Sequence, residues 1–189
     1  MKTIALFGGS FDPPHIGHIK IVEALKKLSF IDKVVVMPTY QNPFKSSFSA
    51  PPYLRLQWLR DIFKNDTQVE VNSYEVDLKK ATPTIESVLY LNEFYDKIYV
   101  VIGADNLGSL KKWHRYEELK KMVNFIVVTR NDMPLEDNFL TLTIQENISS
   151  TQLRRDIQRE KLPKECAAEI EKYYKEKNDK QNRKDNERT

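Results

Sequence analysis

Short apolar runs alternate along the chain with longer segments in which apolar residues recur every three or four positions. The runs predict strands at Thr3–Phe7, Lys33–Met37, Val69–Asn72, Lys97–Ile102 and Asn124–Thr129. The periodic segments predict helices over Gly17–Leu28, Tyr53–Phe63, Pro83–Tyr95, Leu107–Lys112 and Arg115–Met122. Such alternation is typical of parallel βαβ units with right-handed crossovers. The chain is therefore predicted to be an α/β protein with a Rossmann-like, doubly wound parallel sheet.

The pattern beyond Leu142 predicts a small C-terminal helical extension that begins at about residue 149. Hydroxyl side chains at Ser149, Ser150 and Thr151 are typical of a helix start, and Pro163–Tyr174 predicts a further helix. We expect a single domain over residues 1–175. Residues 176–189 are almost wholly polar and predict a disordered tail.

Composition narrows the classes of protein and partner. The 189 residues, 40% of them hydrophobic, suffice for one ordinary core. The formal net charge of +3 is too small to indicate a nucleic-acid-binding surface. A single cysteine, Cys166, excludes an internal disulfide, and neither a membrane-length apolar run nor a secretory signal is apparent. We expect a cytoplasmic protein that binds neither nucleic acid nor membrane.

The segment Gly8–His18, with the sequence GGSFDPPHIGH, joins the first predicted strand to the first predicted helix. A glycine turn at a helix N-terminus gathers free N–H groups and the positive end of the helix dipole, which together favour phosphate. His15 and His18 are three residues apart and share one face of the opening helical turn. The turn lacks the third glycine of the dinucleotide fingerprint and the Gly-Lys-Ser/Thr of the P-loop. The alternative is a structural corner with solvated histidines.

Other polar clusters also follow predicted strands, where ligands bind in parallel sheets. They are Pro38–Lys45, Gly103–Asn106 and Arg130. A further constellation, Ser149–Arg154, combines hydroxyls at a helix start with a guanidinium suited to bidentate phosphate contact. Plain helix capping is the alternative for this segment.

Several motifs together give the chain a family resemblance. The segment GGSFDPPHIGH, paired with ISSTQLR at 148–154, resembles the nucleotidyltransferase superfamily of His-x-Gly-His proteins. IGADNL at 102–107, followed by Leu110 and Trp113, is similar to the IGADxLxxLxxW stretch of bacterial nicotinate-mononucleotide adenylyltransferases. Two segments depart from that pattern: Asn42–Lys45 lacks the histidine of Pro-Pro-His-Lys, and Ala81–Thr84 lacks the glycine and tyrosine of GxSYT. The resemblance covers about residues 1–175.

The resemblance implies adenylyl transfer from ATP to nicotinate mononucleotide, with Mg²⁺ carried by ATP and no dedicated metal site. The implied catalytic residues are His15, His18, Lys45 and Arg154. The implied ATP-binding residues are Gly8, Gly9, Ser10, Phe11, His15, His18, Gly103, Asp105, Ser150, Thr151 and Arg154. The implied mononucleotide-binding residues are Ser10, Lys45, Thr84, Trp113, His114 and Arg130.

Alternatives remain at this point for both residues and function. Trp113 is either a stacking platform for the pyridine ring or a packing residue, and Asp105 either binds nucleotide or caps a helix. Trp58 is expected to be a packing residue, and Arg55 is expected to lie on a solvated helix face. The chain could instead be another adenylyl- or cytidylyltransferase of the superfamily, such as a phosphopantetheine adenylyltransferase. It could also be a non-catalytic module that binds adenine nucleotides. The preference for acid or amide mononucleotide and the oligomeric state, a homo-oligomer included, stay open.

Overall fold

The computed structural model describes residues 1–41, 47–129, 139–146 and 148–186. Two predicted site residues, Lys45 and Arg130, lie outside these ranges. The long loop that follows the second strand is described up to residue 41 and again from residue 47.

Six parallel strands form one sheet in the order β3-β2-β1-β4-β5-β6. This order confirms the predicted doubly wound architecture, in which the chain moves outward from β1 in both directions. Five strands match the predicted apolar runs, and the sixth, an edge strand, was not predicted. The strands are β1 (Thr3–Gly9), β2 (Lys33–Pro38), β3 (Val69–Val71), β4 (Lys97–Gly103), β5 (Asn124–Thr129) and β6 (Leu140–Thr143).

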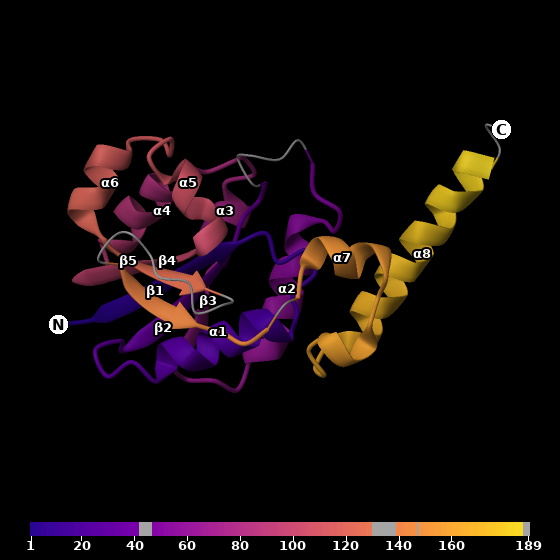
Figure 1. Cartoon of the computed structure of the whole chain (residues 1–189), viewed down its shortest axis with the longest axis horizontal. Coiled ribbons are helices and arrows are strands. Elements are labelled where there is room, and N and C mark those ends of the chain that lie inside the picture. Colours follow the sequence, from indigo (N-terminus) through magenta and orange to yellow (C-terminus); the bar gives the residue numbers. More distant parts are fainter. Residues whose placement is uncertain (42–46, 130–138, 147, 187–189) are drawn as a thin grey trace.

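Helices cover both faces of the sheet, as Figure 1 shows. Because side chains alternate across a strand, Phe7 of β1 packs toward α1 and α2, whereas Leu6 packs toward α4, α5 and α6. The helices are α1 (Ile16–Lys26), α2 (Pro52–Phe63), α3 (Tyr74–Asp77), α4 (Thr84–Leu91), α5 (Leu107–Leu110), α6 (Tyr116–Met122), α7 (Ser150–Arg155) and α8 (Ala167–Asn186), with short 3₁₀ turns η1 (Ala104–Asn106) and η2 (Arg159–Lys161).

The C-terminal extension, α7 to α8, packs on α2 through a third apolar cluster. Trp58 is fully buried there among Leu153, Ile170 and Tyr174, which confirms its predicted packing role. Beyond this contact α8 projects away from the sheet (Figure 1).

The end of the chain differs from its prediction. The last helix begins at Ala167 and continues to Asn186, whereas we expected a helix over Pro163–Tyr174 and a disordered tail from residue 176. The segment is rich in Lys and Glu, which favour helix, and Lys175 pairs with Glu171 one turn earlier at 2.7 Å. No helix in the described ranges has both the length and the apolar character needed to cross a membrane. The single-domain boundary at residue 175 stays a prediction.

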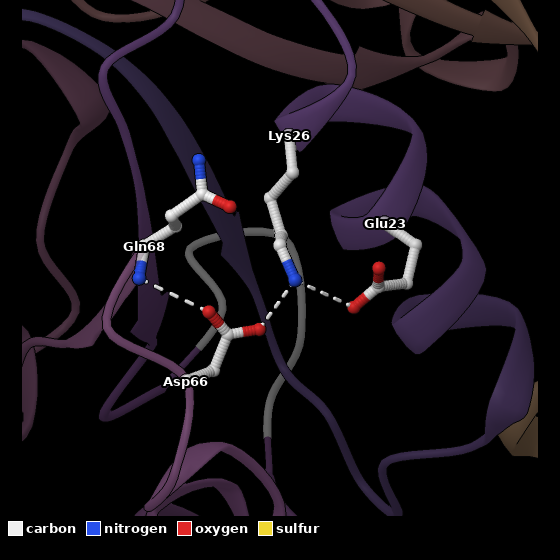
Figure 2. Close-up of polar contacts among 4 residues, drawn as sticks. All are labelled: Glu23, Lys26, Asp66 and Gln68. Carbon is white, nitrogen blue, oxygen red and sulfur yellow. Dashed lines mark hydrogen bonds and ion pairs between the residues drawn. The ribbon is translucent and has the colours of Figure 1, made fainter.

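A polar cluster fixes the C-terminal end of α1 to the loop before β3. Figure 2 shows Lys26 between Glu23 and Asp66, with its Nζ 3.0 Å from Glu23 Oε1. The backbone N–H of Gln68 donates to the second Asp66 oxygen at 3.0 Å. The Asp66 hydrogen bond, more than the Glu23 contact, raises the pKa of Lys26. The cluster therefore anchors the helix whose other end carries the two histidines.

Candidate active site

A cleft of about 960 Å³ opens at the carboxyl ends of β1 and β4. These strands are neighbours, but their crossovers leave on opposite faces of the sheet, so the edge between them is open to a ligand. Every predicted site residue that the structure describes lines this cleft: Gly8, Gly9, Ser10, Phe11, His15, His18, Thr84, Gly103, Asp105, Trp113, His114, Ser150, Thr151 and Arg154. The predictions for Lys45 and Arg130 lie outside the described residues.

The two histidines form a stacked pair at the start of α1. Their ring centroids are 3.7 Å apart with 22° between the planes. The backbone N–H of His15 donates to His18 Nδ1 at 3.1 Å. Because Nδ1 accepts this hydrogen bond, the ring proton of neutral His18 lies on Nε2. The buried Phe11 ring packs edge-on against His18 with a centroid separation of 4.9 Å, so His18 is held from both sides.

Two glycines make room for site side chains. A Cβ at Gly17 would lie 3.0 Å from His15 Nδ1 and 3.1 Å from its Cε1, closer than ordinary contact. A Cβ at Gly103, the last residue of β4, would lie 2.4 Å from Asp105 Oδ1. A side chain at position 17 would therefore displace the stacked His15 ring by a few tenths of an ångström, and Gly103 lets the Asp105 carboxylate fold back over the strand end.

Asp12 is a structural residue of the first turn. Its buried carboxylate accepts the backbone N–H groups of Ser49 at 2.7 Å and Ala50 at 2.9 Å. The Tyr174 hydroxyl of α8 donates to the same group. The Asp12 carboxylate thus ties the start of α2 and the C-terminal helix to the histidine turn.

Arg55 corrects the prediction of a solvated helix face. Its side chain is 1% exposed and donates to the carbonyls of Ser10, Ala50, Thr39 and Tyr40, with Nη2 2.8 Å from the Thr39 oxygen and 2.9 Å from that of Tyr40. Burial lowers its pKa below the usual value. Three of the acceptors, Ser10, Thr39 and Tyr40, belong to the turns after β1 and β2, which α2 thereby joins. No local pattern marked this arginine, because three of its four partners are backbone carbonyls 15 to 45 residues away in sequence.

The second predicted constellation docks on the first. Arg154 of α7 donates to the carbonyl of Asp12 and, at 3.0 Å, to Thr151 Oγ1. The Ser150 hydroxyl donates to the carbonyl of Pro13 at 3.0 Å. Asn178 of α8 donates to the Arg154 carbonyl at 2.9 Å. The glycine turn and the Ser-Ser-Thr helix, more than 130 residues apart, therefore form one wall of the cleft.

Another part of the cleft is lined by α3, α4 and the segment after α5. Thr84 is the first residue of α4, Trp113 is half-buried and His114 is exposed. Within the described residues, Trp113 Nε1 is buried and has no hydrogen-bond partner. The structure thus brings together three of the six residues that the resemblance assigned to the mononucleotide.

Sequence reasoning missed Glu75, a carboxyl group of the four-residue helix α3. Glu75 is 5% exposed and lines the cleft. Its Oε1 accepts the Ser87 hydroxyl at 2.7 Å, whereas Oε2 is buried with no hydrogen-bond partner among the described residues. Burial raises the pKa of Glu75 to about 7. A lone glutamate on so short a helix carries no periodic signal, so only the tertiary structure identifies it.

Comparisons with known proteins find similar sequences over most of the chain. A family model described as cytidylyltransferase-like matches residues 6–156. A probable nicotinate-nucleotide adenylyltransferase of Sulfurimonas denitrificans is 59% identical over 93% of this chain and 97% of its own length. One of Campylobacter fetus is 44% identical over 93% of this chain and 98% of its own length.

A solved structure has the same fold. The nicotinic acid mononucleotide adenylyltransferase of Plasmodium falciparum, complexed with NaAD, superposes with a TM-score of 0.71. It is 20% identical, and the match covers 85% of this chain and 86% of that one. On the sequence matches, the chain belongs to the nicotinate-nucleotide adenylyltransferase family of nucleotidyltransferases.

Proposed function

We propose that the protein joins ATP and nicotinate mononucleotide to give nicotinate adenine dinucleotide and pyrophosphate, a late step in NAD biosynthesis. One observation carries this proposal: the stacked histidines, the Arg154 helix and the Thr84–Trp113 region line one continuous cleft. Such a cleft suits two ligands that must meet, with phosphates near the helix N-terminus and a flat ring near an indole. The names of the relatives, at up to 59% identity over most of the chain, support the same reaction.

The chemistry is an in-line displacement at phosphorus. An oxygen of the mononucleotide 5′-phosphate forms a bond to the α-phosphorus of ATP, and the bond from that phosphorus to the β-bridging oxygen breaks. The electron pair leaves with pyrophosphate. Because the attacking phosphate is already ionised at neutral pH, the reaction needs no general base and no covalent nucleophile. Catalysis then depends on positioning and on stabilising negative charge.

His18 is the residue proposed to meet the developing charge. Its Nδ1 accepts the backbone N–H of His15, which places the ring proton on Nε2, the atom proposed to donate to a phosphate oxygen. A donor aimed at charge that grows in the transition state accelerates the reaction more than one that binds the ground state equally. His15 is stacked on His18 and fixes its plane.

The remaining assignments divide between the two substrates, as the resemblance implies. We assign the ATP phosphates to the backbone of Gly8 and Gly9, to the hydroxyls of Ser10, Ser150 and Thr151, and to the cations Lys45 and Arg154. We assign the nucleoside to Phe11, Gly103 and Asp105. We assign the mononucleotide to Ser10, Lys45, Thr84, Trp113, His114 and Arg130.

Mg²⁺ is proposed to enter as part of the ATP substrate. Within the described ranges, no group of three or more His, Cys, Asp or Glu side chains could hold a metal ion. Mg²⁺ keeps much of its hydration and binds phosphate oxygens readily, so the triphosphate and water can supply its ligands. We also propose a cytoplasmic location, since the single cysteine fits a reducing compartment.

A pyrophosphate-release assay with identification of the nucleotide product tests the proposal. The protein is incubated with MgATP and, in separate reactions, nicotinate mononucleotide, phosphopantetheine or no acceptor. We expect pyrophosphate and dinucleotide in equal amounts with the mononucleotide and background release in the other two reactions. Transfer to phosphopantetheine would instead indicate the related superfamily activity. ATP binding without release in any reaction would indicate a nucleotide-binding module.

A further inference from the structure

Glu75 lines the cleft, and one of its two carboxyl oxygens lacks a hydrogen-bond partner among the described residues. The side chain is nine-tenths or more buried, and the Ser87 hydroxyl occupies only Oε1. Oε2 is buried and, within the described residues, unpartnered. Buried polar atoms in native proteins almost always have a hydrogen-bond partner. An exception that lines a ligand cleft indicates that the ligand supplies the partner.

The position of Glu75 limits which part of a ligand can form a hydrogen bond with its Oε2. It shares the cleft wall with Thr82, Pro83 and Thr84, which lead into α4. Under the proposed function, Thr84 and Trp113 hold the pyridine ring. The ring carbons offer no hydrogen-bonding atom, and the ring nitrogen is bonded to ribose. The substituent at position 3, a carboxylate in the acid and a carboxamide in the amide, is therefore the polar group available to Glu75.

We propose that Glu75, in its protonated form, donates a hydrogen bond to the carboxylate of nicotinate mononucleotide and thereby selects the acid over the amide. The assignment rests on the proposed function and deepens it. An ionised glutamate has only acceptors, so it repels a substrate carboxylate and accepts from a carboxamide N–H instead. A protonated glutamate has the O–H donor that the acid requires. When ionised Glu75 meets the acid, the complex therefore takes up one proton, which is released when the product leaves.

The surroundings of Glu75 favour its protonated form. Burial and the neighbouring Glu86 carboxylate of α4 raise its pKa, the Ser87 hydrogen bond lowers it, and the balance lies at about 7. A second carboxylate at hydrogen-bond distance raises the pKa further, because two such groups hold one proton between them. A carboxyl group kept neutral in order to donate is an established device in active sites. Other ionisable groups on the surrounding elements include Tyr74 and Asp77 on α3, Tyr90 on α4 and Arg55 on α2, and those of the cleft wall include Asp105, Lys112 and His114.

The test compares the two mononucleotides across pH. KM values for the acid and the amide are measured by pyrophosphate release between pH 6 and 8.5, for the wild-type protein and for Glu75→Gln. The ratio of the two KM values cancels the titration of the 5′-phosphate, which both substrates carry. In the wild type, the ratio of the amide KM to the acid KM should fall by up to tenfold per pH unit above about pH 7. In Glu75→Gln the ratio should be independent of pH, because the amide N–H donates at every pH.

Two neighbouring variants separate this role from a structural one. Ser87→Ala removes a hydrogen bond that favours ionised Glu75. The break, which is the pH at which the ratio of the amide KM to the acid KM begins to fall, should therefore move to higher pH than in the wild type. Glu86→Gln removes a like charge, so the break should move to lower pH. A residue that only supports the fold would leave the position of the break unchanged.

Different outcomes refute different claims. A wild-type ratio that stays constant with pH, or that falls equally in Glu75→Gln, overturns the assignment of Glu75. Equal changes in both KM values would overturn it as well, because they would point to an ionised Glu75 facing the pyridinium charge. If Glu75→Gln does not fold, the wild-type profile and the Glu86→Gln shift still decide. Absence of transfer to either mononucleotide refutes the proposed function and the Glu75 assignment with it.

Discussion

Gly17→Ala isolates the geometry of the histidine pair from the stability of the helix that carries it. Gly17 lies in the first turn of α1, between His15 and His18. An added Cβ would lie 3.0 Å from His15 Nδ1, whereas ordinary contacts are about 3.5–4.0 Å. The His15 ring must therefore shift by a few tenths of an ångström, and the stacked His18 ring with it.

The expected effect falls on turnover and not on stability. A misplacement of about 1 Å in a catalytic constellation can lower the rate by about 100-fold, so for a shift of a few tenths of an ångström we expect kcat to fall by roughly three- to tenfold. Alanine is the better helix former by about 1 kcal/mol, which offsets part of the steric strain. The free energy of unfolding should therefore change by less than about 1 kcal/mol.

Pyrophosphate release and chemical denaturation measure the two quantities, with Gly108→Ala as the matched control. Gly108 also lies in a helix, α5, and an added Cβ there meets nothing within 4 Å. Its kcat should equal that of the wild type. A Gly17→Ala protein with wild-type kcat would refute the claim that the ring stack positions His18.

Four further predictions concern single side chains. His18→Ala should keep the fold and lower kcat by about 10²–10³, as expected for a lost oxyanion donor; circular dichroism and turnover check both statements. Trp113→Ala should raise KM for the mononucleotide by about tenfold, and a change confined to KM for ATP would contradict stacking on the ring. Glu75 binds its proton more tightly in the folded state, because its pKa is raised from 4.5 to about 7. The free energy of unfolding should therefore fall by up to about 3 kcal/mol as pH rises from about 4.5 through 7. Chemical denaturation of Glu75→Gln at the same pH values should lack this loss. Lys26→Met should cost about 1 kcal/mol of stability without changing KM for ATP, because it removes the hydrogen bond to Asp66 from the end of α1 remote from the site.

The parts of the fold that depend on burial could be predicted from the sequence. β1 is a continuous apolar run because helices cover both of its faces, and α1 shows a helical period because only one side faces the sheet. β6 lies at the sheet edge, and three of its four residues, in the sequence LTLT, are exposed. It is recognisable only through its backbone pairing with β5, where Leu142 lies opposite Val128.

The site also contains residues that the sequence predicts and residues that only the tertiary structure identifies. The glycine turn and the Ser-Ser-Thr helix are local motifs, so the sequence alone predicts them. Arg55 and Glu75 act through groups that the fold brings to them: backbone carbonyls from two turns for the arginine, and a serine on the following helix for the glutamate. Such partners produce no recognisable pattern in the neighbouring sequence.

The prediction of a disordered tail from residue 176 was wrong, because polarity alone does not separate a solvated helix such as α8 from a disordered tail.

A crystal structure of the protein with nicotinate adenine dinucleotide tests the central claim most directly. We predict the dinucleotide in the cleft between β1 and β4, with its phosphates within hydrogen-bond distance of His18 Nε2 and its pyridine ring against the face of Trp113. A dinucleotide bound elsewhere, with this cleft empty and both histidine rings turned away from it, would contradict the account.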